Sequence, residues 1–191
     1  MQEIEVKFLD INKDVLIAKL EELGAEKVGT FRYIHTAMDF PDYRLNKDNS
    51  WVRIRDEDGV VTCTFKKRLG VTSQDGSTND AGMEEVEIMV SSYQDMKQIF
   101  KKIGMIEKHE VEKIRTRYVL DGVECDIDEI PLAPAYLELE GESMEDLERV
   151  AVKLGFNFAD HKVCSANQIY RLLGIETDDY QILTFAEQVK K

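Results

Sequence analysis

The chain of 191 residues carries a net charge of −13, with 43% hydrophobic and 33% charged residues. This length suits one domain with a substantial core, and the composition excludes an intrinsically disordered chain. The acidity argues against a nucleic-acid binder, because affinity for phosphate backbones comes from accumulated Lys and Arg. It does not exclude a small anionic ligand, which a local basic cluster can hold inside an acidic protein.

Cysteine use and hydropathy indicate a soluble cytoplasmic protein. Cys63, Cys125 and Cys164 are odd in number and match no zinc-binding spacing, so we expect reduced thiols. The N-terminus lacks the apolar segment of a signal peptide, and no apolar run approaches the roughly 18 residues of a membrane span. We therefore expect neither a membrane nor a nucleic acid as a partner.

Hydrophobic periodicity and turn residues predict the elements in chain order. In the first half we expect a strand at 3–8, a helix at 12–24, an extended segment at 25–40, a loop at 41–50, a hairpin of 51–55 with 60–67, a mobile loop at 69–82 and a strand at 84–90. In the second half we expect a helix at 93–103, a hairpin of 105–120 with 123–129, a strand at 136–140, a helix at 143–154 and a mainly helical remainder at 156–191.

These elements predict an α+β fold. Asp121-Gly122 is the strongest two-residue hairpin signal, and short strands joined largely as hairpins predict a closed or nearly closed antiparallel eight-stranded β-barrel with helices packed outside. Residues 174–191 are expected to form a helical extension of that same domain. The apolar residues of this extension would cover one end of the barrel or meet a second copy, which leaves a homodimer open.

The strands share an unusual pattern, because each tends to place charges of one sign at positions i and i+2, on one face. The acidic pairs are Glu3 and Glu5, Glu85 and Glu87, Asp126 and Asp128, and Glu138 and Glu140. The basic residues are Lys7, Arg53, Arg55, Lys66, Lys113, Arg115 and Arg117. The intervening positions are mostly apolar.

An ordinary amphipathic sheet with one wet face explains any single strand of this kind. It explains the set less well, because like charges on one sheet face repel each other. Carboxylate pairs suit Mg²⁺ or Mn²⁺, and Arg and Lys clusters suit phosphate oxygens. The set therefore indicates a polar cavity that holds a divalent metal and a polyphosphate together.

The N-terminal run Glu3-Ile4-Glu5-Val6-Lys7 resembles the ExExK signature of the CYTH superfamily, the triphosphate tunnel metalloenzymes. Later strands are similar to the other strands of that family over roughly 1–173: Trp51 to Arg55, Thr64 to Lys66, Glu85 to Glu87, Lys113 to Arg115, and Glu138 to Glu140. The superfamily includes class IV adenylyl cyclases, thiamine triphosphatases and inorganic triphosphatases. The resemblance implies an antiparallel eight-stranded tunnel that binds a triphosphate with Mg²⁺ or Mn²⁺.

The resemblance also implies a role for each charged position. The metal ligands would be Glu3, Glu5, Glu138 and Glu140, with Asp126 supporting either the metal side or a cation. The triphosphate would be held by Lys7, Arg53, Arg55, Lys66, Lys113 and Arg115, with Arg117 as a further candidate. Glu85 and Glu87 would be catalytic: they would help to bind the metal or orient the attacking water, and one of them would accept or direct its proton.

Three functions follow from this site, and the first is favoured. Triphosphate hydrolysis is expected because the strand with Glu85 and Glu87 keeps both carboxylates, as in triphosphatase-type members. The alternatives are a class IV-type adenylyl cyclase, which converts ATP to cyclic AMP and pyrophosphate, and a non-catalytic polyphosphate or nucleotide sensor. The complete set of acids argues against a pure anion binder, while the choice among tripolyphosphate, thiamine triphosphate and ATP stays open.

Overall fold

The computed structural model describes residues 4–69 and 83–191, so all but the first residue of the expected loop at 69–82 lies outside the described residues. The chain divides into two compact units. Unit 1 comprises Met1–Arg32 and Lys113–Ile169, and unit 2 comprises Tyr33–Glu112 and Tyr170–Lys191. Two long strands, β2 (Glu26–Asp39) and β6 (Ile106–Leu120), contribute residues to both units.

The strands follow the order β1-β8-β7-β6-β2-β3-β4-β5, with β9 paired to β6 and β10 paired to β9. The prediction of an α+β fold with an eight-stranded antiparallel path is confirmed, whereas β9 joins β6 in parallel. Closure into a barrel is not confirmed, because β1 and β5 end the hydrogen-bonded path through the residues described.

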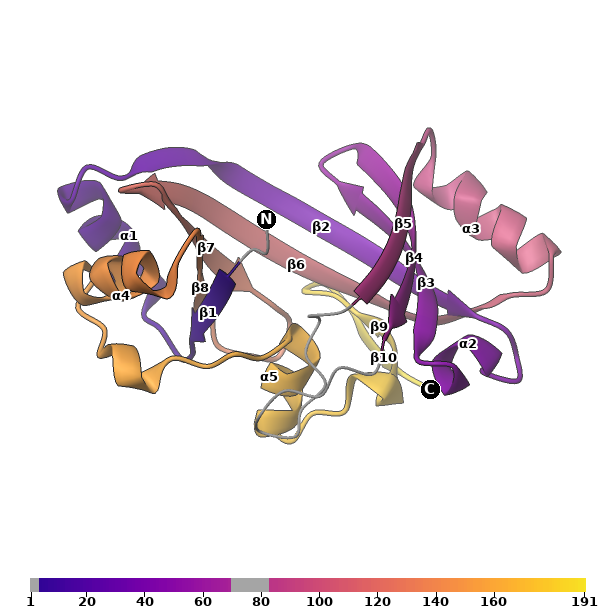
Figure 1. The fold of residues 1–191 in the computed structure, drawn as a ribbon. Coiled ribbons are helices and arrows are strands. Elements are labelled where there is room, and N and C mark those ends of the chain that lie inside the picture. The colour runs from indigo at the N-terminus through magenta and orange to yellow at the C-terminus, as the bar shows by residue number, and fades with distance from the viewer. Residues whose placement is uncertain (1–3, 70–82) are drawn as a thin grey trace. The chain divides into compact units, whose positions relative to one another are not determined.

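Unit 1 is a sheet whose apolar face is covered by helices (Figure 1). Its elements besides parts of β2 and β6 are β1 (Ile4–Phe8), α1 (Lys13–Glu22), β7 (Val123–Glu129), β8 (Tyr136–Gly141), α4 (Met144–Lys153), η1 (Phe158–Asp160) and the first half of α5 (Ala166–Leu172). Val6, Leu137 and Leu139 of the strands pack with Leu20 of α1 and Leu147 of α4, and all are fully buried. The charged positions of the same strands therefore lie on the opposite face.

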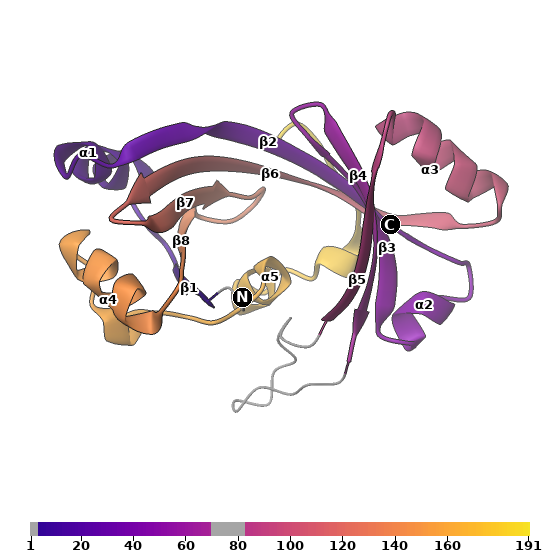
Figure 2. The same ribbon diagram turned by 45° about the horizontal axis from the view of Figure 1, so that its top comes forward.

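Unit 2 repeats this arrangement with a different set of helices (Figure 2). Its elements are α2 (Arg44–Lys47), β3 (Ser50–Glu57), β4 (Val60–Arg68), β5 (Met83–Val90), α3 (Tyr93–Lys102), η2 (Thr177–Asp179), β9 (Tyr180–Leu183) and β10 (Gln188–Lys190). Ile54 of β3 is fully buried in an apolar cluster with Tyr93 of α3, and Leu45 of α2 packs against that cluster. The short helix α2 falls within the region expected to be a loop at 41–50.

Local signals set the helix and hairpin boundaries as expected. The side chains of Asn12, Ser92 and Ser143 each accept a hydrogen bond from a backbone N–H in the first turn of α1, α3 and α4. Asp121 and Gly122 adopt φ values of 52° and 83°, the left-handed pair that a two-residue hairpin requires. The helices α1, α3 and α4 are short. Within the described part of the chain, no helix is long and apolar enough to cross a membrane.

The helical prediction for 174–191 is wrong. Beyond α5 the chain forms η2 and then the hairpin of β9 and β10, in which Ile182 pairs with Val189. The edge of β6 explains the difference: Glu110 and Val111 pair in parallel with Ile182 and Leu183, so tertiary pairing overrides the local pattern. Leu183 is fully buried in this position.

Candidate functional site

The charged positions of unit 1 meet on one face of β1, β6, β7 and β8. Arg115 lies opposite Asp128, Arg117 opposite Asp126, and Asp126 opposite Glu138, which in turn lies opposite Lys7. We call Lys7, Lys113, Arg115, Arg117, Asp126, Asp128 and Glu138 the Arg115 cluster. Lys7 is 3% exposed, Glu138 7%, Asp126 1% and Asp128 not at all.

Arg115 is the centre of this cluster. Its Nε and Nη2 atoms donate to the two oxygens of Asp128, each at 2.7 Å. Nη2 also donates to Glu138 at 2.7 Å, and Nη1 lies 2.6 Å from Asp126. Such bidentate, charge-assisted contacts fix the plane of the guanidinium.

Glu138 joins Arg115 to Lys7, whose Nζ lies 2.9 Å from Glu138 and 2.7 Å from Glu5. Burial disfavours the ionised form of Glu138, but the charges of Arg115, Lys7 and Lys113 outweigh it and lower the pKa of Glu138 to about 2. Burial likewise disfavours the charged form of Lys7, but Glu138 and Glu5 raise the pKa of Lys7. Both groups are therefore charged at neutral pH.

Lys113 differs from the other cations of the cluster. Its Nζ lies 3.0 Å from Asp128, yet burial, together with the neighbouring charge of Arg115, lowers the pKa of Lys113. The charged form of Lys113 is therefore disfavoured, and a further negative charge close to its ammonium group would stabilise that form.

Asp126 forms a bidentate ion pair with Arg117. Arg117 donates Nε and Nη2 to the two oxygens of Asp126, each at 2.7 Å, while Arg115 contacts one of the same oxygens. Arg117 Nη1 also lies 2.8 Å from Glu124. With both oxygens held by guanidinium groups, Asp126 positions the two arginines. Its support of a metal ion stays a prediction.

The remaining carboxylates predicted to bind metal lie near the ends of β1 and β8. Glu5 lies opposite Glu140, and Glu140 lies opposite Glu124 on β7, while Glu3 lies outside the described residues. Like charges in direct cross-strand register repel, so a cation between them is stabilising. The hard oxygen donors of this row fit Mg²⁺ or Mn²⁺ in kind.

The number of ligands narrows how such a metal would bind. Over residues 4–69 and 83–191, no three acidic, His or Cys side chains are arranged to hold a metal ion by themselves. Mg²⁺ is commonly bound by one or two carboxylates and completed by water and substrate phosphates. One or two of the carboxylates Glu5, Glu138 and Glu140 therefore fit a metal that phosphate oxygens complete.

Unit 2 carries a second charged group, the Glu87 cluster, formed by Arg53, Arg55, Thr64, Lys66, Glu85 and Glu87. Thr64 lies opposite Glu87 and donates its hydroxyl to that carboxylate at 2.6 Å, while Lys66 lies opposite Glu85 with its Nζ at 2.9 Å. Arg53 Nη2 lies 3.8 Å from Glu87. The Arg53–Glu87 distance is longer than the ion pairs of Arg115, which lie at 2.6–2.7 Å.

Glu85 and Glu87 of β5 keep access to solvent, with side chains 39% and 38% exposed. The Thr64 hydrogen bond, followed by the charges of Arg55 and Arg53, lowers the pKa of Glu87. Glu87 is thus an ionised, accessible acceptor within a field of cations, a setting suited to orienting a water molecule. Arg55 contacts Glu57 at 3.8 Å and lies 5.7 Å from the ring centroid of Tyr33.

Asp128 belongs to one of the acidic pairs that the sequence shows, but no role in the site was predicted for it. It is fully buried and accepts hydrogen bonds from the side chains of Arg115 and Lys113. The hydroxyl of Tyr136 also hydrogen-bonds to it. The signal that identifies it is the Asp121-Gly122 turn, since a two-residue turn fixes the register and places Asp128 opposite Arg115.

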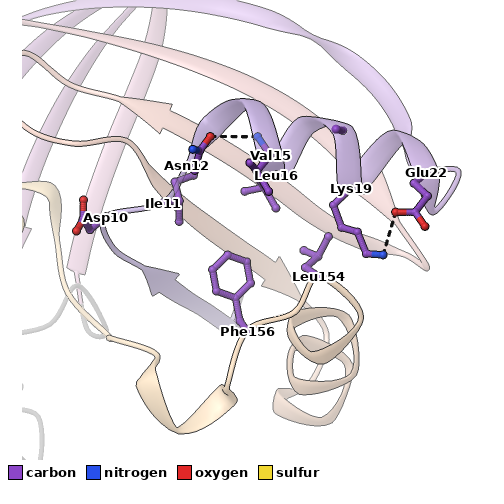
Figure 3. A pocket seen from close by; sticks show the side chains of 10 residues that line it. Asp10, Ile11, Asn12, Val15, Leu16, Lys19, Glu22, Leu154 and Phe156 are labelled. Atoms are coloured by element: carbon purple, nitrogen blue, oxygen red, sulfur yellow. Dashed lines mark hydrogen bonds and ion pairs between the residues drawn. The ribbon is translucent and has the colours of Figure 1, made fainter.

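A groove of about 620 Å³ in unit 1 lies apart from these charges (Figure 3). Leu16 of α1 faces Phe156 and Leu154 across it, and Lys19 at its rim pairs with Glu22 at 3.0 Å. None of the predicted site residues lines it. Its walls are mainly apolar, and Lys19, the cation that lines it, is already paired with Glu22.

Comparison with known proteins identifies the family. The family model of the CYTH domain matches residues 1–173. A protein of Methanocaldococcus jannaschii, provisionally named an adenylate cyclase, is 29% identical over 148 residues, which are 77% of this chain and 80% of the relative.

Solved structures share the fold. A protein from Pyrococcus horikoshii superposes with a TM-score of 0.65 at 22% identity, over 88% of this chain and 99% of that one. A protein from Hippeastrum, provisionally named an adenylyl cyclase and described as having a dominant triphosphatase activity, superposes with a TM-score of 0.64 at 16% identity. The match covers 91% of this chain and 97% of that one.

Proposed function

The chain belongs to the CYTH domain family, and from this membership and its charged clusters we propose that it is a metal-dependent triphosphatase acting on inorganic or organic triphosphates. The observation that carries the proposal is the Arg115 cluster: Lys7, Lys113 and Arg115 are gathered on one sheet face with the carboxylates of Asp128 and Glu138. A structural sheet face would be solvated or apolar, whereas phosphate binding requires concentrated cations.

Within this proposal, the cations that the sequence pattern assigned to the triphosphate neutralise its charge. Phosphoryl transfer depends mainly on positioning and on stabilising charge at the phosphate oxygens. Arg53, Arg55 and Lys66 supply three cations in unit 2, and Lys7 and Lys113 supply two in unit 1. Asp128 and Asp126 keep Arg115 oriented beside them.

Glu85 and Glu87 are proposed to handle the attacking water. Glu87 is ionised and accessible, and Thr64 fixes its carboxylate, so it can accept a hydrogen bond from water and orient a lone pair toward the terminal phosphorus. Glu85, held by Lys66, is placed to receive the proton. A bound Mg²⁺ or Mn²⁺ would act as a Lewis acid on the phosphate oxygens, with one or two of Glu5, Glu138 and Glu140 as its protein ligands.

Adenylyl cyclisation is the second candidate, favoured by the names of the Methanocaldococcus relative and of the Hippeastrum protein. It requires the same grip on the triphosphate but places a ribose hydroxyl against the α-phosphorus. The Hippeastrum protein is also described as having a dominant triphosphatase activity, although 16% identity supports only the shared fold. The accessible pair Glu85 and Glu87 favours water as the nucleophile.

One incubation panel separates these reactions. The protein is incubated with tripolyphosphate, thiamine triphosphate or ATP, with Mg²⁺ or Mn²⁺ or with chelator, and orthophosphate, pyrophosphate and cyclic AMP are measured. Hydrolysis predicts metal-dependent orthophosphate from at least one substrate. Cyclic AMP with pyrophosphate would establish the cyclase instead, and no product from any substrate would contradict both.

A matched pair of arginine variants tests the site. Arg55→Ala should raise KM and remove about 2–4 kcal/mol of transition-state stabilisation, because a charge-assisted phosphate contact is lost. Arg44→Ala removes the same charge from α2, where the side chain is 58% exposed and pairs with Asp42, and should leave kcat/KM unchanged. Equal kinetics in the two variants would remove Arg55 from the site.

A further inference from the structure

The N–H donors of Arg115 are already committed to carboxylates. A guanidinium has five N–H groups, and three of those of Arg115 donate to Asp128 and Glu138 at 2.7 Å. The remaining two belong to Nη1, which lies 2.6 Å from Asp126. A phosphate group that binds Arg115 must therefore compete with a carboxylate of the protein.

Glu138 is the carboxylate on which this competition turns. Its Oε1 accepts from Arg115 at 2.7 Å and its Oε2 lies 2.9 Å from Lys7, so one residue holds two of the proposed phosphate-binding cations. Glu138 is also the most buried of the proposed metal ligands. The same two oxygens thus serve the cations now and a metal ion when one binds.

Neither ligand alone satisfies every charge around Glu138. A triphosphate that draws Lys7 and Arg115 toward itself leaves a buried carboxylate without counter-charges, which is costly. A divalent cation that takes the oxygens of Glu138 leaves Lys7 and Arg115 without theirs. When both ligands bind, the metal ion replaces Lys7 and Arg115 as the partner of Glu138, and the triphosphate replaces Glu138 as the partner of Lys7 and Arg115.

We propose that Glu138 makes metal and triphosphate binding mutually dependent. Its carboxylate holds Lys7 and Arg115 away from phosphate until a divalent cation binds that carboxylate in place of the two side chains. The inference rests on the proposed function and adds a regulatory step to that site. It agrees with the ligand count, since the described residues include no set of three that would hold a metal without phosphate oxygens.

Binding in the absence of metal tests the inference directly. Isothermal titration with tripolyphosphate in EDTA compares the wild type with Glu138→Gln. The amide keeps the shape of the side chain but releases Lys7 and Arg115, so the variant should bind tripolyphosphate about tenfold more tightly than the wild type. A residue needed only as a metal ligand or for structure predicts no such gain.

Glu148→Gln is the charge-matched control. Glu148 lies exposed on α4 of the same unit, and its substitution makes the same change in net charge. It should bind tripolyphosphate in EDTA like the wild type. A gain in Glu148→Gln equal to that in Glu138→Gln would overturn the inference, because general electrostatics would then explain both.

Repeating the titration with Mg²⁺ gives the second half of the test. Mg²⁺ should tighten binding to the wild type and to Glu148→Gln, whereas the affinity of Glu138→Gln should change much less. Formation of the Mg²⁺–tripolyphosphate complex is common to all three titrations and cancels in the comparison. Equal or weaker binding by Glu138→Gln in EDTA overturns the coupling.

A milder variant keeps the test decisive if Glu138→Gln fails to fold, as judged by circular dichroism. Glu5 contacts Lys7 at 2.7 Å, and its side chain is 47% exposed, so Glu5→Gln should fold and show a smaller gain in metal-free affinity. No gain in Glu5→Gln would then overturn the inference. If no protein binds tripolyphosphate in either buffer, the proposed function itself fails, which is a different outcome.

Discussion

Replacing Asp128 by alanine should destabilise the protein strongly, because it removes a fully buried counter-charge from Arg115 and Lys113. Asp128 is fully buried and holds Arg115 through two bonds of 2.7 Å and Lys113 at 3.0 Å. Removing one partner of a buried, hydrogen-bonded ion pair costs about 3–5 kcal/mol. For a chain of this size each kcal/mol shifts Tm by about 2–4 °C, so Tm should fall by about 6–20 °C.

Glu124→Ala is the matched control on the same strand and the same sheet face. Its side chain is 40% exposed and contacts Arg117 at 2.8 Å, and exposed ion pairs of this kind contribute about 0–1 kcal/mol. The assay is urea unfolding followed by circular dichroism, in which an unchanged m-value ensures that the free energies of unfolding are comparable. Free energies of unfolding for the two variants within about 1 kcal/mol of each other would refute the reasoning about burial.

Two further predictions concern unit 2. Burial disfavours ionisation of Glu107, but hydrogen bonds from Lys101 and Lys97 outweigh it and lower the pKa of Glu107 below 4.5, so its stabilising contribution is present above that pH and lost as the pH falls through the folded-state pKa. Unfolding titrations should therefore show the free-energy gap between wild type and Glu107→Gln closing below about pH 4.5, and a constant gap would contradict the assignment. Leu183→Ala should lower the free energy of unfolding by about 2–5 kcal/mol by opening a cavity between β9 and its neighbours, whereas Val189→Ala on the exposed β10 should cost much less in the same urea assay. Equal losses would show that β9 contributes no more to the core than β10 does.

Much of the site could be derived from the sequence wherever a tight turn fixes the register. The Asp121-Gly122 turn alone places Arg115 opposite Asp128 and Arg117 opposite Asp126. Alternation along each strand then assigns all of these side chains to one face and the apolar residues to the other. The helices that cover the apolar face follow from the same pattern, and the core of unit 1 confirms them.

Contacts between strands far apart in the chain could not be derived in this way. No turn links β1 to β8, so the sequence contains no signal that places Lys7 opposite Glu138. The hairpin of β9 and β10 was missed for a related reason, because its stability depends on the free edge of β6. Local spacing reports which face a residue occupies, while long-range register decides which charges become neighbours.

The pattern of charges also permitted two explanations that only the contacts distinguish. Segregation by sign, strand by strand, suggested that external ligands neutralise each strand. In unit 1 the acidic and basic strands lie side by side, so Arg115 neutralises Asp128 and Glu138 within the protein. Under the proposed function, neutralisation by ligands would therefore be an exchange of partners.

This exchange bears on why such a cluster would be kept. Well-packed apolar side chains in place of a buried ion-pair network are often as stabilising as the network or more so. Stability alone therefore does not explain why the face of β6, β7 and β8 retains Arg115, Asp126, Asp128 and Glu138. A face that must release its cations to a triphosphate and its carboxylates to a metal needs both kinds of charge, in contact with each other until the ligands replace them.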